Sequence, residues 1–463
     1  MRRSLFVLSI LVLLVLATFA LAQSELATLT GTVSDPSGGV LVGAKVRVTN
    51  QATNLVTEAV TNESGRYLIP SLRPGVYSVS VSQAGFKTHV RSGVTLQVNE
   101  AARLDITLDV GQVTEQVTIT AEAPLLQTET AARGSVIDEK KIVELPLNGR
   151  DYNQLATLSP GVLLPTPRLQ SIGFKGAFNV NGNRAFQNAF RLDGVENTSY
   201  SNSYRGGNMQ MVQPSIEALQ EFKIQTNAYS AEFGRSSGAL INAVIKSGSN
   251  ALHGSLYEFH RNRALDANNF FSNKSGADKP FRLRNQFGAA VGGPIVKDKA
   301  FIFGDYEGLR DRRGEVRFSS VAQPIWRAGM FTRPIFNPLN PTDAGLDFRQ
   351  PATGACRSAD GLYCWIIPAN LVDPVGRKVM DVSPDPNTGA PGTIDNNFVH
   401  VPIERNRTDQ FDIRYDQNFT QNFTFFGRYS FSDTNIFKPA PRPGLAEGSF
   451  NDTFGAALWR SQQ

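Results

Sequence analysis

Short runs in which apolar and polar residues alternate occupy much of the chain and predict a mainly β protein. Near the N-terminus, Tyr77, Val79 and Val81 alternate with serines. Because successive side chains of a strand point to opposite faces, this period of two predicts strands with one buried and one solvated face. Clusters of turn residues separate the runs, at 35–39, 62–65 and 73–75. We therefore expect an antiparallel β-sandwich over residues 23–110.

Alternation in the second half of the chain is richer in aromatic residues. In 411–416 the odd positions are apolar and the even ones charged, and Tyr257 and Phe259 alternate with Glu258 and His260. Aromatic residues on one face of a strand and charged residues on the other favour lipid on one side and water on the other, as in a transmembrane β-barrel. A soluble sandwich, whose polar face would lie outside, is the alternative. Six strands are expected in the segment 250–463, at 252–263, 285–293, 299–310, 406–418, 422–434 and 452–460.

Residues 130–249 read as an α+β domain between these two regions. Helices are expected at 138–144 and 215–222, among short strands. Segments 179–184 and 197–208 are crowded with Asn, Gly, Ser and Arg, which suits a wet interface rather than a dry core. This composition predicts a plug domain that sits against a polar lumen.

Six charged residues of this domain are candidates for contacts between the plug and the barrel. Paired with lumen charges, they could seal a pore reversibly. Ordinary solvated surface is the alternative for each of them. The six are Arg150, Arg184, Arg191, Asp193, Glu232 and Arg235.

The first 22 residues are expected to be a signal peptide. Arg2 and Arg3 precede an apolar run at 5–21, and Ala20 and Ala22 supply a small-x-small cleavage site. An uncleaved anchor helix is the alternative, because the run approaches spanning length. Export would permit a disulfide between Cys356 and Cys364, with two free thiols as the alternative.

Composition narrows the function classes. The chain has 463 residues, is 41% hydrophobic and carries a net charge of +5 without a block of Lys or Arg, so no nucleic acid partner is implied. Four histidines and two cysteines, without a close cluster, predict no metal or cofactor site. The G-x-S-x-G match at 234–238 precedes an expected strand at 239–246, whereas a nucleophile elbow needs a helix there. We expect no enzyme activity.

A stiff, extended segment at 113–121 links the sandwich to the plug. β-branched residues dominate it, and no glycine interrupts them. Such a strand can add to the sheet edge of a partner protein. The last strand of the sandwich is an equally good interpretation. The residues on the proposed binding side are Val113, Glu115, Val117 and Ile119.

Several motifs resemble those of a known family. The runs at 31–36, 61–67 and 72–77 resemble a carboxypeptidase regulatory-like domain, whose fold is similar to starch-binding domains. The plug motifs are LPLNGR at 145–150, LSPGV at 158–162, FRLDGV at 190–195 and SAEFGRSSGA at 230–239. Together they resemble TonB-dependent outer-membrane receptors of the Oar-like branch.

This resemblance implies a location, a partner and a mechanism. Such a protein is exported through the periplasm and lies in the lipid of the bacterial outer membrane. Residues 111–129 would be a TonB-box-like linker, gripped by the TonB energy-transducing complex. The plug would shift to admit an unidentified extracellular substrate, such as a carbohydrate or a peptide. A secreted carbohydrate-binding or adhesion protein is the second hypothesis.

Length conflicts with a complete transporter. A barrel that encloses such a plug needs about 22 strands, and hence at least about 400 residues. Only six strands are expected after residue 250. Open edges in lipid would leave backbone groups unpaired, at a cost of several kcal/mol each. We therefore expect an incomplete barrel, in a truncated chain that does not transport.

Overall fold

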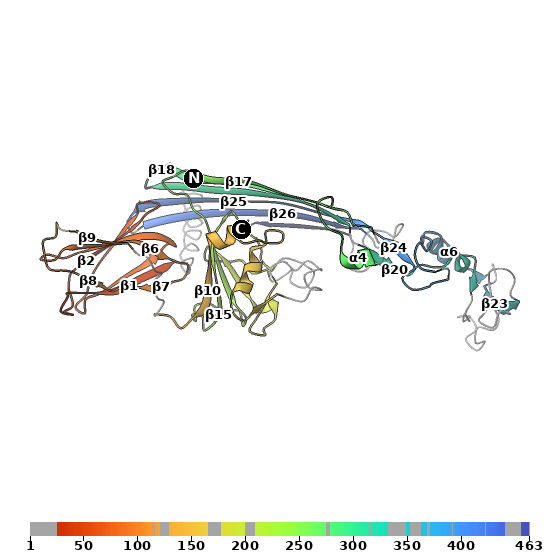
Figure 1. Ribbon diagram of the computed structural model, residues 1–463, viewed down its shortest axis with the longest axis horizontal. Coiled ribbons are helices and arrows are strands. Elements are labelled where there is room, and N and C mark those ends of the chain that lie inside the picture. The colour runs from red at the N-terminus through yellow and green to blue at the C-terminus, as the bar shows by residue number, and fades with distance from the viewer. Residues whose placement is uncertain are drawn as a thin grey trace, which may run out of the picture.

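A computed structural model gives the architecture of the chain. It describes residues 26–114, 116–120, 129–164, 177–199, 209–274, 278–314, 316–331, 349–351, 363–367, 371–390, 392–421, 423–439 and 455–462. The molecule is elongated: six long strands arch over two smaller bodies (Figure 1). The signal peptide expected at 1–22 lies outside the described residues, and so does Cys356 of the expected disulfide.

The first body is a sandwich of two sheets. One sheet has the order β4-β1-β7, with β8 also beside β1, and the other has the order β3-β2-β5-β6-β9. The strands are β1 (Ala27–Ser34), β2 (Lys45–Asn50), β3 (Val56–Val60), β4 (Arg66–Leu72), β5 (Gly75–Ser82), β6 (Thr88–Leu96), β7 (Ala101–Arg103), β8 (Ile106–Thr107) and β9 (Gln116–Thr120). The alternating residues Tyr77, Val79 and Val81 are buried between the sheets, as predicted.

The sandwich is mixed rather than antiparallel, which corrects the prediction. β7 and β8 both run parallel to β1, and β9 runs parallel to β6. A period of two specifies which side of a strand is buried, but it carries no information on the direction of the neighbouring strand. Parallel pairs need a crossover, and here the chain returns to β1 only after β2–β6.

The second body, which we call the central domain, is built on a five-stranded sheet of order β10-β15-β16-β13-β14. These strands are β10 (Arg133–Asp138), β13 (Ala189–Leu192), β14 (Val195–Glu196), β15 (Leu219–Asn227) and β16 (Leu240–Ile245). Around it lie α2 (Glu139–Glu144), η2 (Tyr152–Leu158), η3 (Ala185–Gln187) and the hairpin of β11 (Val162–Leu163) and β12 (Asn179–Val180).

One of the two predicted helices is correct and the other is wrong. α2 begins after Asp138, whose carboxylate caps the backbone N–H of Lys141. The predicted helix at 215–222 is instead a turn that leads into β15. β15 is central in its sheet and buried on both faces, so its sequence lacks alternation, and Ile216, Leu219 and Phe222 imitate helical spacing.

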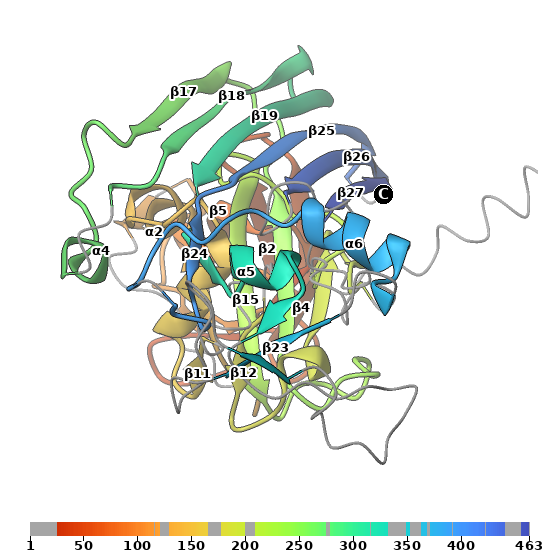
Figure 2. The same ribbon diagram turned by 90° about the vertical axis from the view of Figure 1, so that its right-hand side faces the viewer.

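The third body is a curved antiparallel sheet of order β17-β18-β19-β25-β26-β27, which we call the strand wall. Its strands are β17 (His253–Asn262), β18 (Arg282–Val296), β19 (Ala300–Gly314), β25 (Ile403–Thr420), β26 (Phe423–Lys438) and β27 (Gly455–Gln462). All six predicted strands are present, most of them longer than predicted. Figure 2 shows the wall curving around one flank of the central domain.

The two ends of the wall differ. Short turns at 297–299 and after Thr420 lie beside the sandwich, where Asn54 donates to Asp298 at 2.9 Å. The described parts of the long connections 263–281 and 315–402 lie at the other end. They carry the small elements α4 (Phe270–Lys274), β20 (Arg317–Ser319), α5 (Pro324–Arg327), β21 (Met330–Phe331), β22 (Arg349–Pro351), β23 (Tyr363–Ile366), α6 (Pro374–Asp381) and β24 (Phe398–His400). Within the described residues, none of the helices has the length and apolar character needed to cross a membrane.

The wall has a polar inner face and an apolar outer face. On β25, Asp412, Arg414 and Asp416 point to the central domain and are buried, whereas Ile413 is 48% exposed on the outside. Aromatic residues share that outer face on β26, where Phe425 and Tyr429 are both 44% exposed. This arrangement agrees with the prediction from alternation in 411–416.

β17 reverses the predicted orientation. Tyr257 and Phe259 are on the side of the central domain, where Phe259 is still 49% exposed, and the outer positions are taken by Leu256 and Glu258. The cation of Arg150 lies over both inward rings. Aromatic residues opposite charges therefore did not identify the lipid side on this strand.

Candidate functional site at the junction of three bodies

The turn between β13 and β14 carries the central carboxylate of the junction. Asp193 and Gly194 have φ values of +49° and +80°, as a tight Asp-Gly turn requires. The turn directs the Asp193 carboxylate at the wall, where one oxygen lies 3.0 Å from Nη1 of Arg414 and the other 2.8 Å from Nε of Arg428. The backbone N–H of Ile245 also donates to Asp193 at 3.0 Å. One aspartate thus joins the central domain to two neighbouring wall strands.

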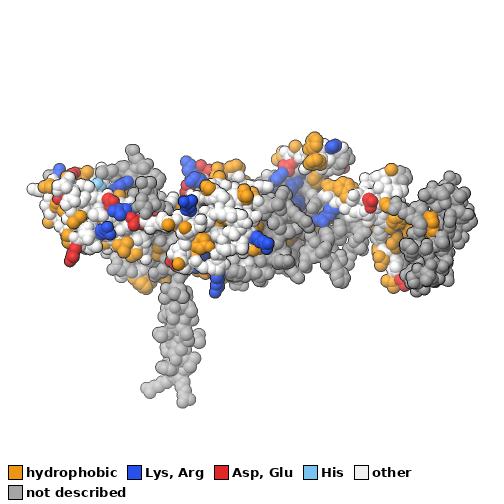
Figure 3. Space-filling view, turned by 90° about the horizontal axis from the view of Figure 1, so that it is seen from below, with side chains coloured by type: hydrophobic (Ala, Val, Ile, Leu, Met, Phe, Trp, Pro, Cys, Tyr) orange, Lys and Arg blue, Asp and Glu red, His pale blue; other side chains and the backbone are white. Residues whose placement is uncertain are grey.

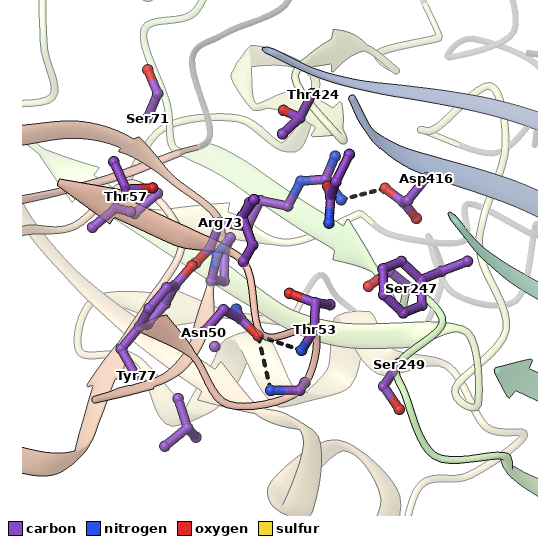
Figure 4. A pocket seen from close by; sticks show the side chains of 18 of the residues that line it. Asn50, Thr53, Thr57, Ser71, Arg73, Tyr77, Ser247, Ser249, Asp416 and Thr424 are labelled. Atoms are coloured by element: carbon purple, nitrogen blue, oxygen red, sulfur yellow. Dashed lines mark hydrogen bonds and ion pairs between the residues drawn. The ribbon is translucent and has the colours of Figure 1, made fainter. Parts of the chain in front are cut away.

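The same ion pairs continue to the sandwich. Nε of Arg414 lies 3.1 Å from Asp416, and Asp416 also pairs with Arg73, in the turn between β4 and β5 (Figure 4). The ring of Phe426 lies 4.8 Å from the Arg414 guanidinium and 5.8 Å from that of Arg73. Arg73, Asp416, Arg414, Asp193 and Arg428 form what we call the ion chain.

The ion chain is largely shielded from water. The Arg414, Asp193 and Arg428 side chains are 6%, 2% and 5% exposed. Ionised groups lose several kcal/mol of hydration each on burial, which their mutual attraction only partly offsets. The ion chain therefore contributes little to net stability. It fixes the position of the three bodies relative to one another, because any displacement would leave a buried charge without its partner.

Arg150 makes a second contact between the central domain and the wall. Its Nη2 lies 2.8 Å from Glu217, and its guanidinium lies 4.5 Å from the ring centroids of both Tyr257 and Phe259. The Tyr257 hydroxyl donates in turn to Glu307 at 2.9 Å. A cation held between two aromatic rings and a carboxylate combines cation–π and ionic attraction in one place.

Contacts between the sandwich and β15 are also buried and polar. The Val98 backbone N–H donates to the Glu221 carboxylate, and Nζ of Lys223 donates to the Asn99 carbonyl at 2.8 Å. Burial raises the pKa of Glu221 to about 7 and lowers the pKa of Lys223. Both shifts disfavour charge at this contact, so sandwich docking on β15 is sensitive to protonation.

A cavity of about 510 Å³ lies where the three bodies meet (Figure 4). Arg73, Asn50 and Tyr77 line it from the sandwich, and Lys246 lines it from the central domain. Tyr77 donates to the Arg73 carbonyl at 2.6 Å and so fixes the turn that carries Arg73. On the face of the molecule that is turned away from the wall, basic and acidic side chains are interspersed (Figure 3).

The structure brings some predicted plug residues to the wall and leaves others elsewhere. Arg150 and Asp193 contact it directly, as described above. The guanidinium of Arg191 lies 5.0 Å from the Phe233 ring, within the central domain. Arg184, Glu232 and Arg235 are exposed and form no ion pair with any described residue.

Val113, Val117 and Ile119 lie in a segment at the edge of the sandwich, and Glu115 lies outside the described residues. The described strand of this segment, β9, pairs in parallel with β6, from Thr88 opposite Gln116 onward. This is the position expected if the segment is the last strand of the sandwich. β9 ends its sheet, so its second edge has no neighbouring strand among the described residues.

Sequence reasoning missed most of the junction. Residues that it did not single out include Arg73, Glu217, Glu221, Lys223, Arg414, Asp416 and Arg428. The signal for Arg414 and Asp416 was available, because charges at even positions of 411–416 imply an inner polar face. Nothing local marked Arg73, which reads as an ordinary turn residue.

Comparison with known proteins identifies two parts of the chain. Residues 244–460 match the family described as outer membrane beta barrel domain, and residues 28–109 match the carboxypeptidase regulatory-like domain. The protein is therefore an outer-membrane protein, with a regulatory-like sandwich preceding its strand wall. The match to an outer-membrane barrel lends no support to the hypothesis of a secreted adhesion protein.

One curated relative matches more than half of the chain. The TonB-dependent transporter Oar of Myxococcus xanthus is 32% identical over 301 residues, or 62% of this chain and 27% of that protein. The chain is thus a homologue of the TonB-dependent transporters, of Oar type, and it matches about a quarter of that relative's length.

Solved structures give weaker likenesses. The outer membrane transporter YddB from Escherichia coli aligns with a TM-score of 0.40 and 14% identity, over 66% of this chain and 34% of that chain. Catechol 1,2-dioxygenase from Pseudomonas arvilla C-1 aligns with a TM-score of 0.17 and 16% identity, over 22% of this chain and 58% of that chain. Neither likeness contributes to the functional argument.

Proposed function

We propose that the protein acts in TonB-dependent transport across the outer membrane, with the central domain as a plug against the inner face of a β-barrel. The ion chain is the observation that carries this proposal. Beside a small apolar contact at Ala290 and Phe303 of the wall, it holds the plug by charged side chains, and such contacts can exchange with water when the plug moves. No bond is made or broken in this function, and the substrate is unidentified.

In the same proposal, the segment at 113–119 is the contact for the TonB complex. β9 is an edge strand, and a partner strand can add to such an edge through backbone hydrogen bonds. Force on β9 would reach the plug through the sandwich, because the sandwich contacts β15 at Glu221 and Lys223. Arg150 and Asp193 would then be the plug residues that part from the wall.

Cysteine cross-linking in the intact outer membrane tests this proposal. Thr118, in β9, is changed to cysteine after both native cysteines have been replaced by serine, and TonB carries a cysteine in its periplasmic domain. We expect a disulfide that depends on an energised inner membrane. The matched control is Ser64→Cys, on an exposed turn of the same sandwich. Equal cross-linking at both positions, or none at Thr118, would contradict the proposed contact.

A further inference from the structure

The apolar zone on the outer face of the wall has a clear upper border. On β26 the outward aromatic residues run from Phe423 to Phe431, about 26 Å at about 3.3 Å per residue. A run of nine residues is about the number with which a tilted strand crosses the apolar band of an outer-membrane barrel. Phe431 pairs with Phe411 of β25, which pairs with Tyr306 of β19. This aromatic row is the border away from the sandwich.

Beyond the border, arginines lie opposite arginines on adjacent strands. Arg310 of β19 pairs with Arg407 of β25, and Arg312 pairs with Arg405. All four occupy outward-facing positions, and the Arg407 side chain is 68% exposed. Directly opposed residues of an antiparallel pair have Cβ atoms about 5 Å apart, and like charges there are destabilising. We call these four residues the arginine quartet.

The protein itself neutralises only part of this charge. Asp409 lies 2.6 Å from Arg310 and 2.8 Å from Arg407, and Asp433 of β26 is opposite Asp409, so two carboxylates face four arginines. Arg312 lies over the Phe281 ring at 5.4 Å. Among the described residues, neither Arg312 nor Arg405 has an ion-pair partner. The quartet therefore favours an external anion.

A hollow on the outer face lies just below the quartet. It is shallow and open, with a volume of about 500 Å³, and its lining combines Leu256, Phe287, Ala289 and Tyr306 with Tyr257, Gly288 and the acidic Glu258. Tyr306 also donates from its hydroxyl to Asp409 at 2.7 Å, so the hollow adjoins the carboxylate that pairs with the quartet. A mostly apolar hollow below a cationic cluster fits an amphipathic ligand, with the anionic group uppermost.

We propose that the arginine quartet binds a phosphate group of an outer-leaflet glycolipid, with an acyl chain of that lipid in the hollow. The long connections of the wall lie at the quartet's end, and barrels of this class carry their longer loops outside the cell. Arginine suits phosphate because its planar guanidinium can donate two parallel hydrogen bonds. The site depends on the outer-membrane location and not on TonB-driven transport.

Native mass spectrometry of the full chain in neutral detergent tests the site, with bisphosphorylated lipid A as the probe. We expect the double variant Arg312→Gln/Arg405→Gln to bind lipid A about tenfold more weakly than the unmodified protein, equivalent to about 1.4 kcal/mol. Arg312→Lys/Arg405→Lys, which keeps the charge without the planar fork, should fall between them. The control Lys297→Gln/Lys299→Gln removes the same charge at the opposite end of β19 and should bind normally.

Two further arms separate the sources of phosphate and a structural role. Phosphatidylcholine and millimolar inorganic phosphate should neither bind measurably nor displace lipid A, and displacement by inorganic phosphate would show an ordinary anion site instead. Without lipid A, the glutamine variant should unfold at the same temperature as the unmodified protein or higher, since repulsion is removed. A lower unfolding temperature, or lipid A binding equal to that of the unmodified protein, would overturn the proposal, whatever the cross-linking of Thr118 gives.

Discussion

β17 and β25 have similar sequence patterns and opposite orientations. Each alternates aromatic or aliphatic residues with charged or polar ones, yet Tyr257 of β17 faces inward while Ile413 of β25 faces outward. The inward aromatic residue contacts Arg150 of the central domain. On β25 the inner positions are instead taken by Arg414 and Asp416, which belong to the ion chain.

The difference shows what alternation can specify. A period of two fixes which residues share a face, but the partner on each side decides which face is inner. A cation can be held by carboxylates, as on β25, or by aromatic rings, as on β17. Aromatic content alone therefore does not identify the lipid side of a strand.

The largest expected effect comes from breaking the inner contact of β25. Asp193→Ala leaves Arg414 and Arg428 buried without the Asp193 carboxylate between them. We expect local stability to fall by about 3–5 kcal/mol. Hydrogen exchange at the Ile245 amide, which donates to Asp193, should accelerate accordingly. Glu232→Ala removes an exposed carboxylate of the same domain and should leave that exchange rate unchanged, and equal acceleration by both would contradict the role of the ion chain.

A charge on the outer face of β25 should have the next largest effect. Tyr415→Lys places a cation opposite Gly427, midway along the outward aromatic run of β26, and the cost is about 2–4 kcal/mol near the middle of the bilayer. The variant should therefore insert poorly or unfold at lower urea concentration in lipid vesicles. Thr424→Lys, at an inward-facing position beside the cavity, is the control. If both lysines cost the same, the two faces of the wall are not distinguished as described.

Removing the cation that lies over the inward rings of β17 should have a smaller effect. Arg150→Ala loses the contacts with both rings and with Glu217, and we expect a loss of about 2 kcal/mol. Fluorescence or near-ultraviolet circular dichroism should show that the Tyr257 side chain has become more mobile. Arg150→Lys restores a cation and should recover part of the loss. An unchanged aromatic signal in Arg150→Ala would mean that other contacts orient β17.

The smallest expected effect, taken per pH unit, is a pH dependence of sandwich docking. Glu221 has a pKa of about 7 in the folded protein, raised by burial from its ordinary value of 4.5. The contribution of Glu221 to the stability of sandwich docking is fully present below pH 4.5, and it is lost as the pH rises through the folded-state pKa of about 7. Docking should weaken over that window by at most about 1.4 kcal/mol per pH unit.

Comparing the unmodified protein with Glu221→Gln isolates this contribution. The amide stays neutral and can still accept from the Val98 backbone N–H. The difference in unfolding free energy between the two proteins should therefore change across this pH range and level off below it. A difference that is constant with pH would contradict a raised pKa at Glu221.

Much of the architecture follows from local patterns in the sequence, but the contacts at the junction of the three bodies do not. Turn clusters and alternation predicted the sandwich and all six wall strands, because strand period and turn chemistry are local properties. The helix expected at 215–222 failed because a strand buried on both faces has no alternation. Asp193 was singled out by its motif, but Arg414 lies 221 positions away along the chain, and no local pattern encodes that pairing.

Spin-label accessibility on the two contrasted strands tests the central claim most directly. Labels at Phe411, Ile413 and Tyr415 are compared with labels at Tyr257 and Phe259 in the membrane-embedded protein. The first three should collide freely with oxygen dissolved in lipid. The other two should collide much less with that oxygen, and Phe259, which is 49% exposed on the inner face, should be reached by a water-soluble relaxant. High oxygen accessibility at Tyr257 and Phe259, matching that of Ile413, would contradict the opposite orientation of β17 and β25.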